Sequence, residues 1–452
     1  MKLKAEDVQY LAFEGGGGKG YVYLGAAKAL ENLPLNEDKK LLPIDLSTPG
    51  QNRIKGVSGA SAGAITALLI ALGLNAEQED EIFSNTETFL KFYEKPKVGW
   101  ERTVNGRNYS SLQYNGSGMI PAKVWNNIIT KSLGGILLKK YVDALAKMFN
   151  PTKSKYYLPG KIGSNLISYS NSVVYDKGFF VGQVMTEFLK DTIQGCLTKI
   201  PSKYTADELR NINFRDFHVL TEVDLIVTGT NVTKHEPKYF SKYHTPEFPI
   251  ADAVGISASL PLAFKPVHVE VDVPVGTYNR KSDDYCGYFV DGGVLNNFPI
   301  HAFDHLQQSI SSKYPNLKPL HPNMLGLRLK EGPDWYTPPK KGGIKSPLFD
   351  DIKSYLFDAI GNVYEQILPE SSIQFLTDFY STIRFPSGEG QIRALEERDQ
   401  IIDLDIYGLS LLDFAPSPDL KKEPIDNAYD TVLRYFEGPP QYLGPHGTTP
   451  AE

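Results

Sequence analysis

Four consecutive glycines, Gly15–Gly18, constrain the fold of this chain more than any other feature, because they join a strand pattern to a helix pattern. The apolar segment 8–13 precedes them, and residues 22–32 have the spacing of a helix. A strand, a glycine turn and a helix in this order present backbone N–H groups to an anion. That anion is either a bound phosphate or the oxyanion of a hydrolytic intermediate, and the loop alone does not decide between them.

The same succession recurs once. Residues 53–58 predict a buried strand, residues 61–72 predict an apolar helix, and the sequence Gly-Ala-Ser-Ala-Gly at 59–63 lies between them. A serine on so sharp a turn projects its hydroxyl, and the flanking Gly59 and Gly63 let neighbouring backbone pass closely. The helix dipole favours negative charge on the serine oxygen. Ser61 is therefore a candidate nucleophile, and the alternative is a serine that only caps the helix.

The order of patterns over the first 75 residues predicts an α/β fold with a parallel sheet covered by helices. Residues 75–210 are expected to form a mostly helical insertion or cap. The later segments alternate in type, with strand patterns at 218–232, 267–275, 286–293, 324–329 and 401–409, a helix-like segment at 250–264, further helices towards the carboxyl end, and a disordered tail at 441–452.

Composition excludes several classes of protein. The formal net charge of −6 argues against nucleic acid as a general partner. Cys196 and Cys286 are the two cysteines, which favours two thiols over a disulfide and provides no metal-ligand cluster. The first residues lack the pattern of a secretory signal, and no run reaches the roughly 18 apolar residues of a membrane span. We expect a cytoplasmic protein, with export by a signal-independent route as the alternative.

Asp291 is the candidate general base. It ends a strand pattern and is followed by Gly292 and Gly293. In a parallel sheet a carboxylate there would lie at the same edge as Ser61. The alternative is an Asp-Gly-Gly turn without catalytic function. A Ser-His-Asp triad with His301, His305 or His321 is also possible in chain order, but Ser61 comes too early for that fold and a Ser-Asp dyad is favoured.

Four motifs in this order, "EGGGGKG", "GASAG", "SASLPLAF" and "DGGVLNNFP", resemble the patatin-like phospholipase family, most closely its bacterial members. The resemblance implies one domain over 8–440 with a three-layer α/β/α fold and a mostly parallel central sheet. It implies hydrolysis of fatty-acyl esters of phospholipids or lysophospholipids without calcium or another cofactor. By motif, Ser61 is the nucleophile and Asp291 the base. The oxyanion hole is the loop of Gly15, Gly16, Gly17, Gly18, Lys19 and Gly20.

Two features depart from the family pattern. Glu14 stands where the family usually has Asp, which leaves its contact at the strand end open. The insertion at 75–210 is not typical of the plant members, so substrate size and regulation do not transfer.

A dinucleotide-binding protein is the main alternative, because Gly15, Gly17 and Gly20 satisfy G-x-G-x-x-G. That motif needs an acid at the tip of the next strand, and Asp38 and Asp45 fall instead in a polar connection. A P-loop is excluded because Tyr21, not lysine, follows Gly20. A non-catalytic protein that keeps the fold is a third hypothesis, against which the intact site motifs argue.

Residues 121–161 contain eight lysines and one acid, Asp143, among aromatic residues. Part of this segment has the pattern of a basic amphipathic helix, which is suited to anionic lipid surfaces. It could equally be a helix packed on its own core with a solvated lysine face. We therefore predict possible peripheral membrane contact through this segment.

Overall fold

The structure is a computed structural model of the 452-residue chain. It describes residues 3–35, 40–85, 88, 91–92, 101–104, 107–110, 177–269, 285–306, 321–330, 398–407, 409 and 416–437.

The described strands are β1 Tyr10–Phe13, β2 Gly56–Gly59, β3 Glu101–Val104, β4 Arg107–Ser110, β5 Gly178–Phe180, β6 Asp224–Asn231, β7 Glu236–Phe240, β8 Leu262–Phe264, β9 Val267–Val269, β10 Gly287–Asp291, β11 Met324–Lys330 and β12 Ile401–Asp405. The described α-helices are α1 Val22–Asn32, α2 Ala62–Ala71, α3 Ala76–Ser84, α9 Gln183–Leu197, α10 Ala206–Arg210, α11 Phe214–Thr221, α12 Ile250–Ser257 and α15 Pro418–Glu437. Short 3-10 helices include η2 Gly17–Tyr21 and η5 Gly292–Val294.

Five strands form the parallel part of the main sheet, in the order β12, β11, β1, β2, β6. Each glycine motif follows one of the central strands: the glycine loop leaves β1, and the serine turn leaves β2. Because β1 and β2 are parallel neighbours in register, both turns lie at the same edge of the sheet. The predicted α/β class with a mostly parallel sheet is confirmed.

Strand β6 is longer than β2 and pairs with two strands along the same side. Val227 pairs with Gly59 of β2, whereas Gly229 pairs with Asp291 of β10, which runs antiparallel. Strand β7 pairs with both Val227 and Gly229, so it occupies the opposite side of β6 and leaves β2 and β10 on the shared side. The carboxyl ends of β2 and β10 therefore point towards each other, about two residues or ~7 Å apart along β6.

This arrangement corrects one expectation. Asp291 was expected beside Ser61 because both would end parallel strands, and the structure shows β10 antiparallel to β6. The two residues meet because β6 extends past the end of β2 and provides a partner for a strand arriving from the opposite direction.

The two faces of the sheet are covered differently, as the alternation of side chains along each strand requires. Leu11 and Phe13 of β1 belong to the large core that includes side chains of α1, α2, α9, α12 and α15. Ala12, between them, belongs to a smaller core on the other face, which is closed by Ile300 and Phe303. Helices thus cover one face of the sheet, and residues 298–306 cover part of the opposite face.

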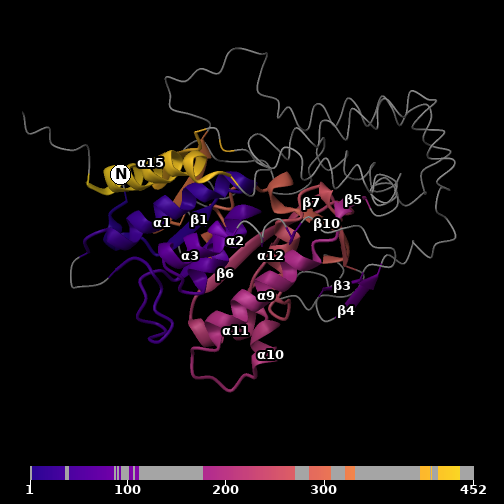
Figure 1. The fold of residues 1–452 in the computed structure, drawn as a ribbon. Helices are drawn as coiled ribbons and strands as arrows, with labels where there is room; N and C mark the ends of the chain where they lie inside the picture. The colour runs from indigo at the N-terminus through magenta and orange to yellow at the C-terminus, as the bar shows by residue number, and fades with distance from the viewer. Residues whose placement is uncertain are drawn as a thin grey trace, which may run out of the picture.

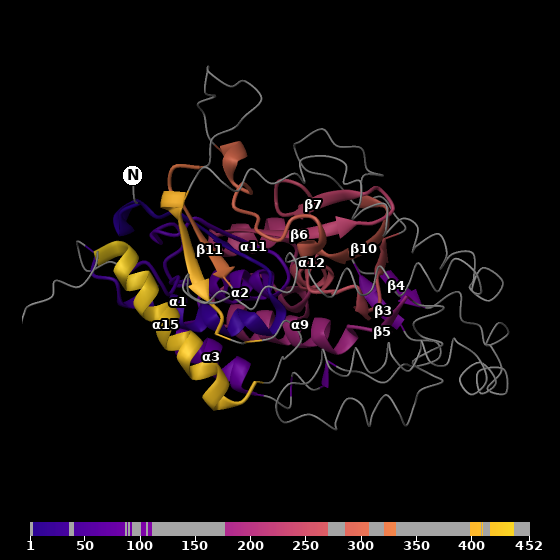
Figure 2. The same ribbon diagram turned by 90° about the horizontal axis from the view of Figure 1, so that it is seen from above.

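Helix α15 packs along α1, and Figures 1 and 2 show the two helices side by side. Gly25 of α1 permits this contact, because a Cβ there would overlap the carbonyl oxygen of Ile425 in α15. Segments from the two ends of the chain are therefore packed together against the same sheet.

Other sequence expectations have mixed outcomes. Residues 22–32 form a helix with the bounds predicted, but 218–221, expected in a strand, end helix α11. The segment 75–210, expected to be mostly helical, contains helices α3, α9 and α10 but also strands β3, β4 and β5, and α9 packs into the main core. Much of this segment, including 111–176, lies outside the described residues, as do the tail 441–452 and most of the closing helical segments. The single domain over 8–440 stays a prediction.

Candidate active site

Ser61 occupies a strained turn between β2 and α2. Its backbone angles, φ 52° and ψ −124°, lie in a region that residues other than glycine rarely adopt. A Cβ at Gly59 would overlap the carbonyl oxygen of Gly63, and a Cβ at Gly63 would overlap that of Phe13 at the end of β1. Both glycines of the motif are therefore required by close backbone contacts, and the turn projects the Ser61 hydroxyl.

The side chains of Ser61 and Asp291 contact each other directly. The Ser61 Oγ donates a hydrogen bond of 2.7 Å to Asp291 Oδ2, with no imidazole between them. The other carboxylate oxygen of Asp291 accepts the N–H of Gly293 at 2.7 Å, and its own N–H donates to the carbonyl of Ser259 at 2.9 Å. Together these three hydrogen bonds fix the position of Asp291 and orient its carboxylate towards Ser61.

Asp291 is almost completely buried, with 2% of its surface exposed. Burial raises the pKa of its carboxyl group to about 7, and the hydrogen bonds from Ser61 and Gly293 oppose the rise. An acid with a pKa near neutrality can both accept and return a proton under ordinary conditions, which is the property of a general base.

Glycines 292 and 293 form the turn that fixes Asp291. A Cβ at Gly292 would overlap Thr228 Oγ1 in β6, and one at Gly293 would overlap Asn297 Oδ1. A side chain at Gly292 would also overlap the backbone of Thr228, whereas one at Gly293 would displace the side chain of Asn297. The Asp-Gly-Gly sequence is thus a turn, as one interpretation expected, and the same turn holds the carboxylate against Ser61.

Asn297 connects this turn to the glycine loop, and it was not singled out from the sequence. The N–H of Gly15 donates to the carbonyl of Asn297 at 2.9 Å, while Asn297 Nδ2 donates to the carbonyl of Gly15 at 3.0 Å. The same amide group donates to Glu14 Oε1 at 3.2 Å. "NN" in the last motif was the available signal, but one sequence does not distinguish Asn297 from Asn296.

Glu14, the departure from the family pattern, has defined contacts. Its Oε2 accepts the N–H of Leu329 in β11 at 2.7 Å, and burial raises the pKa of its carboxyl group against these hydrogen bonds. Its carbonyl accepts the hydroxyl of Tyr23 at 2.6 Å. Glu14 thus ties the end of β1 to β11 and α1.

The glycine loop continues as the 3-10 helix η2. The N–H of Gly15 is used by Asn297, and Gly16 packs against Leu329. The N–H groups of Gly17 and Gly18 begin η2, where a helix has no internal acceptor for them, and both residues line the pocket beside Ser61. Gly17 and Gly18, in the middle of the predicted oxyanion loop, therefore line the site, whereas Gly15, its first residue, has a structural role. Gly20 also lines the pocket, and Lys19 is half-buried.

Ser257, at the end of α12, is a second residue that the sequence did not single out. Its hydroxyl accepts the N–H of Ser61 at 3.0 Å, and its side chain is fully buried. It therefore helps to hold the backbone of the strained turn in place. The motif "SASLPLAF" contains this serine together with Ser259, whose carbonyl binds the Asp291 N–H.

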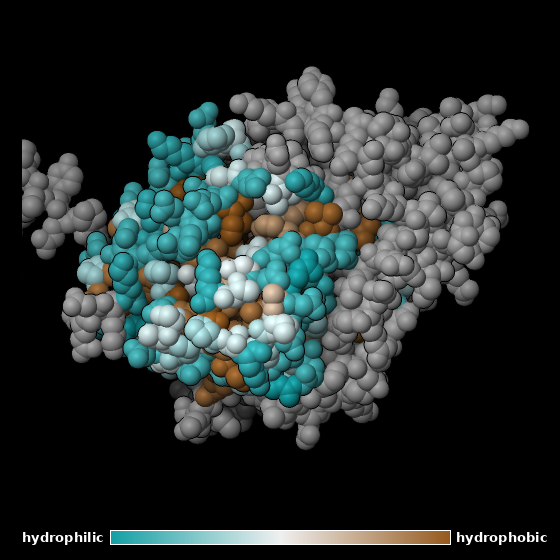
Figure 3. All heavy atoms as spheres, turned by 60° about the horizontal axis from the view of Figure 1, so that its bottom comes forward, coloured by the Kyte–Doolittle hydropathy of each residue, from teal (hydrophilic) through white to brown (hydrophobic). Residues whose placement is uncertain are grey.

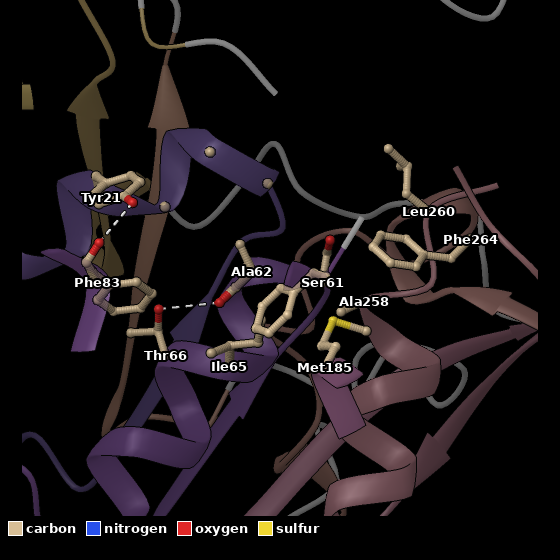
Figure 4. A pocket seen from close by; sticks show the side chains of 14 residues that line it. Tyr21, Ser61, Ala62, Ile65, Thr66, Phe83, Met185, Ala258, Leu260 and Phe264 are labelled. Carbon is tan, nitrogen blue, oxygen red and sulfur yellow. Dashed lines mark hydrogen bonds between the residues drawn. The ribbon is translucent and has the colours of Figure 1, made fainter. Parts of the chain in front are cut away.

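An apolar pocket opens beside Ser61 (Figure 4), with a volume of about 750 Å³ counted together with its opening to solvent. Its wall contains Ala62 and Ile65 of α2, Met185 of α9, and Phe264 of β8. The apolar lining of this pocket favours a hydrocarbon ligand.

The alternatives weighed from the sequence do not converge on this site. His301 Nδ1 lies 2.7 Å from Asp304 Oδ2, and the backbone N–H of His321 donates to Asp304 Oδ1 at 3.0 Å. Of the acids considered for a dinucleotide ribose, Asp45 accepts hydrogen bonds from Ser47 in its own turn. Asp38 and the side chain of His305 lie outside the described residues.

Within the described ranges, no group of three or more His, Cys, Asp or Glu side chains is arranged to hold a metal ion. Among the same residues, no helix combines the length and the apolar character needed to cross a membrane. Cys196 and Cys286 are not joined in a disulfide bond.

The basic segment 121–161 lies outside the described residues. The described residues seen in Figure 3 are mainly hydrophilic at the surface, with brown areas between teal and white ones. Val219 is the exposed large hydrophobic residue in the part of the chain that is described, at 65%.

A family model described as patatin-like phospholipase matches residues 11–304 of this chain. These residues make up more than half of the chain and include most of β1, the serine turn and the Asp-Gly-Gly turn. The chain belongs to the patatin-like phospholipase family.

Two curated relatives match shorter segments. The chain is 28% identical over 165 residues to "Probable lipid hydrolase 463L" of Invertebrate iridescent virus 6, which covers 36% of this chain and 49% of the relative. It is 33% identical over 107 residues to the uncharacterized protein YqhO of Bacillus subtilis (strain 168), which covers 22% of this chain and 33% of the relative. The matches span about half and one third of these relatives.

Among solved structures, VipD from Legionella pneumophila superposes with a TM-score of 0.38 at 18% identity, over 95% of this chain and 67% of that one. Full-length ExoU in complex with SpcU, from the type III secretion system of Pseudomonas aeruginosa, gives 0.36 at 14% identity, over 95% and 52%. Both TM-scores lie below 0.5, and the family assignment rests on the sequence match.

Proposed function

We propose that this protein is a serine acyl hydrolase that cleaves fatty-acyl esters of phospholipids or lysophospholipids, with Ser61 as nucleophile and Asp291 as general base. The observation that carries the proposal is the 2.7 Å hydrogen bond between Ser61 Oγ and Asp291 Oδ2 beside an apolar pocket. Membership of the patatin-like phospholipase family supports a lipid substrate.

In the acylation half of the reaction, ionised Asp291 accepts the proton of the Ser61 hydroxyl as Oγ attacks the ester carbonyl carbon. The carbonyl oxygen becomes an oxyanion in the tetrahedral intermediate. When the ester C–O bond breaks, the leaving alcohol oxygen takes the proton from Asp291. The product is an acyl ester on Ser61 and an ionised Asp291.

In the deacylation half, a water molecule gives a proton to Asp291 and its oxygen attacks the acyl carbonyl carbon. Collapse of the second tetrahedral intermediate breaks the bond to Ser61 Oγ, which recovers the proton from Asp291. The fatty acid leaves, and Ser61 and Asp291 return to their starting states.

The oxyanion is stabilised by backbone N–H groups of residues that line the pocket. Gly17 and Gly18 at the start of η2 provide two of them, and Ala62, the first residue of α2, provides a third. Gly15 does not contribute its N–H, because Asn297 accepts it. Lys19 either attracts a lipid phosphate or orients the loop.

Fatty-acid release from phosphatidylcholine and lysophosphatidylcholine micelles tests the proposal. We expect Ser61→Ala and Asp291→Asn each to lower kcat by at least about 10³-fold, because nucleophile and base act as one unit. Chelation of divalent cations is expected to leave the rate unchanged. If Asp291→Asn stays active while a histidine variant is inactive, the dyad is wrong.

Two further expectations remain proposals. Segment 121–161 would bring the enzyme to anionic membrane surfaces, and the protein would act in the cytoplasm. Binding of the full chain to vesicles with and without anionic lipid measures the first.

A further inference from the structure

The pocket beside Ser61 ends in a wall of two aromatic side chains, Tyr21 of η2 and Phe83 of α3. Figure 4 shows both at the end of the pocket away from Leu260 and Phe264, with Ser61 between the two ends. The Tyr21 hydroxyl donates to the Phe83 carbonyl at 3.0 Å, and the ring centroids are 5.6 Å apart. Two elements that are distant in the sequence are therefore joined into one wall.

On the α2 side, the wall between Ser61 and these rings is apolar apart from one hydroxyl group. Ala62, Ile65 and Thr66 come from consecutive turns of α2 and line this stretch of the pocket. The one hydroxyl among them, Thr66 Oγ1, donates to the carbonyl of Ala62 at 3.2 Å and is thereby satisfied. Such a lining favours methylene groups and disfavours a charged or hydroxylated head group.

The aromatic wall is braced from behind by the C-terminal helix. Lys421 of α15 places its Nζ 5.4 Å from the centroid of the Tyr21 ring, a cation–π geometry. The same Nζ lies 2.8 Å from Ser84 Oγ and 3.4 Å from Asp80 Oδ1, both on α3 next to Phe83. One side chain thus holds together the two elements that supply the wall.

We propose that the stretch of pocket between Ser61 and Tyr21–Phe83 holds the fatty-acyl chain, and that this aromatic wall limits the length of chain the enzyme accepts. The proposal rests on the proposed function. From Ser61 to Thr66, α2 rises about 7–8 Å, the length of roughly six single bonds of extended chain. Medium-length chains fill this stretch, and the terminal carbons of longer chains must bend or remain outside it.

Binding separates this proposal from the chemistry. In the Ser61→Ala background, which cannot form an acyl-enzyme, the full chain is titrated with octanoate, dodecanoate and hexadecanoate by displacement of a fluorescent fatty acid. Phe83→Ala removes one ring of the wall. The matched control is Phe436→Ala, which removes another half-buried phenylalanine, on α15 and outside the pocket lining.

We expect Phe83→Ala to improve the affinity for hexadecanoate relative to octanoate by about tenfold, since each additional buried methylene contributes to binding. Phe436→Ala is expected to leave that ratio unchanged. An unchanged ratio in Phe83→Ala, or fatty acids that do not compete for the pocket, overturns the proposal.

A hydrolysis assay on 4-nitrophenyl esters of the same three acids separates the two claims. With one leaving group throughout, a change in kcat/KM with chain length reports the acyl part alone. Displacement without ester hydrolysis would contradict the proposed function and leave the acyl pocket standing. Hydrolysis with an unshifted binding ratio in Phe83→Ala would contradict the acyl wall and leave the function standing.

Discussion

At the scale of single residues, the site combines two energetically unfavourable features, a strained backbone at Ser61 and a buried carboxyl group at Asp291, and each is held by its neighbours. Ser61 adopts a strained positive φ, and Asp291 is a buried carboxyl group without a cationic partner among its described contacts. Neither would persist in an unconstrained chain. The close glycine contacts fix the first, and the N–H of Gly293 and the Ser61 hydroxyl orient the second.

The pKa of Asp291 predicts the pH dependence of the enzyme. Because the base must be ionised, kcat/KM is expected to rise with pH through about 7 and then to level off. Initial rates on a neutral ester between pH 5 and pH 9 measure this. A rate that is flat across this range would contradict the assignment of Asp291 as the base.

The same pKa predicts the stability of Asp291→Asn. A carboxyl group whose folded pKa is raised stabilises the fold fully below its unfolded pKa, and this contribution is lost as the pH rises through about 7. At pH 8 the wild-type protein therefore carries an ionisation cost on the order of 4 kcal/mol that asparagine does not have. We expect Asp291→Asn to be inactive and at least as stable as wild type in thermal unfolding at pH 8. A variant that unfolds more readily at pH 8 would contradict this.

Ser257 is expected to act as a positioning residue for the nucleophile. Ser257→Ala leaves the N–H of Ser61 without its acceptor and lets the strained turn relax, so kcat should fall by about tenfold or more with KM little changed. Ser259→Ala is the matched control: it is equally buried on the same segment, but its hydroxyl bonds only to the carbonyl of Gly255. Equal effects of the two substitutions on kcat would indicate general destabilisation instead.

At the scale of elements, the contact between α1 and α15 depends on one missing side chain. Gly25→Ala gains helix propensity of about 1 kcal/mol, but its Cβ would overlap the backbone of α15. We expect a net loss of roughly 1–3 kcal/mol in the free energy of unfolding, as overpacking typically costs.

Gly195→Ala in α9 is the matched control for that substitution, because no atom lies within 4 Å of the added Cβ. It should stabilise the protein by about 0.5–1 kcal/mol. Urea unfolding of the two variants gives the comparison. Stabilisation by both would mean that α15 is not packed against α1 in this way.

The brace formed by Lys421 predicts a change in selectivity. Lys421→Met removes the charge that contacts Tyr21, Ser84 and Asp80, so the aromatic wall should become less rigid and discrimination between octanoyl and hexadecanoyl esters should weaken a few-fold. Lys422→Met, which removes the same charge from the next and more exposed position, is expected to have no such effect. The ratio of kcat/KM values for the two esters measures it.

At the scale of the whole molecule, the sequence specified the local units better than their assembly. The strand, glycine loop and helix at 8–32 and the serine turn at 59–63 follow from local patterns, and the structure has them. The antiparallel entry of β10 could not be predicted, because it depends on β6 extending past β2, and strand register is a long-range property.

The candidate site shows the same division. Ser61 and Asp291 were predicted from motif context, and the structure brings them together. Ser257 and Asn297 were missed because each acts through a contact with backbone far away in the sequence, and an ordinary serine or asparagine has no pattern that reveals such a contact. Gly15 was expected among the oxyanion donors, but its N–H is used to join the glycine loop to the Asp-Gly-Gly turn.

The central claim is that Ser61 is a nucleophile activated by Asp291. Labelling of the full chain with a fluorophosphonate, followed by assignment of the modified residue by mass spectrometry, tests it most directly. We predict one modified residue, Ser61, with a labelling rate that rises through about pH 7 and is lost in Asp291→Asn. Labelling at another residue, or undiminished labelling of Ser61 in Asp291→Asn, would contradict it.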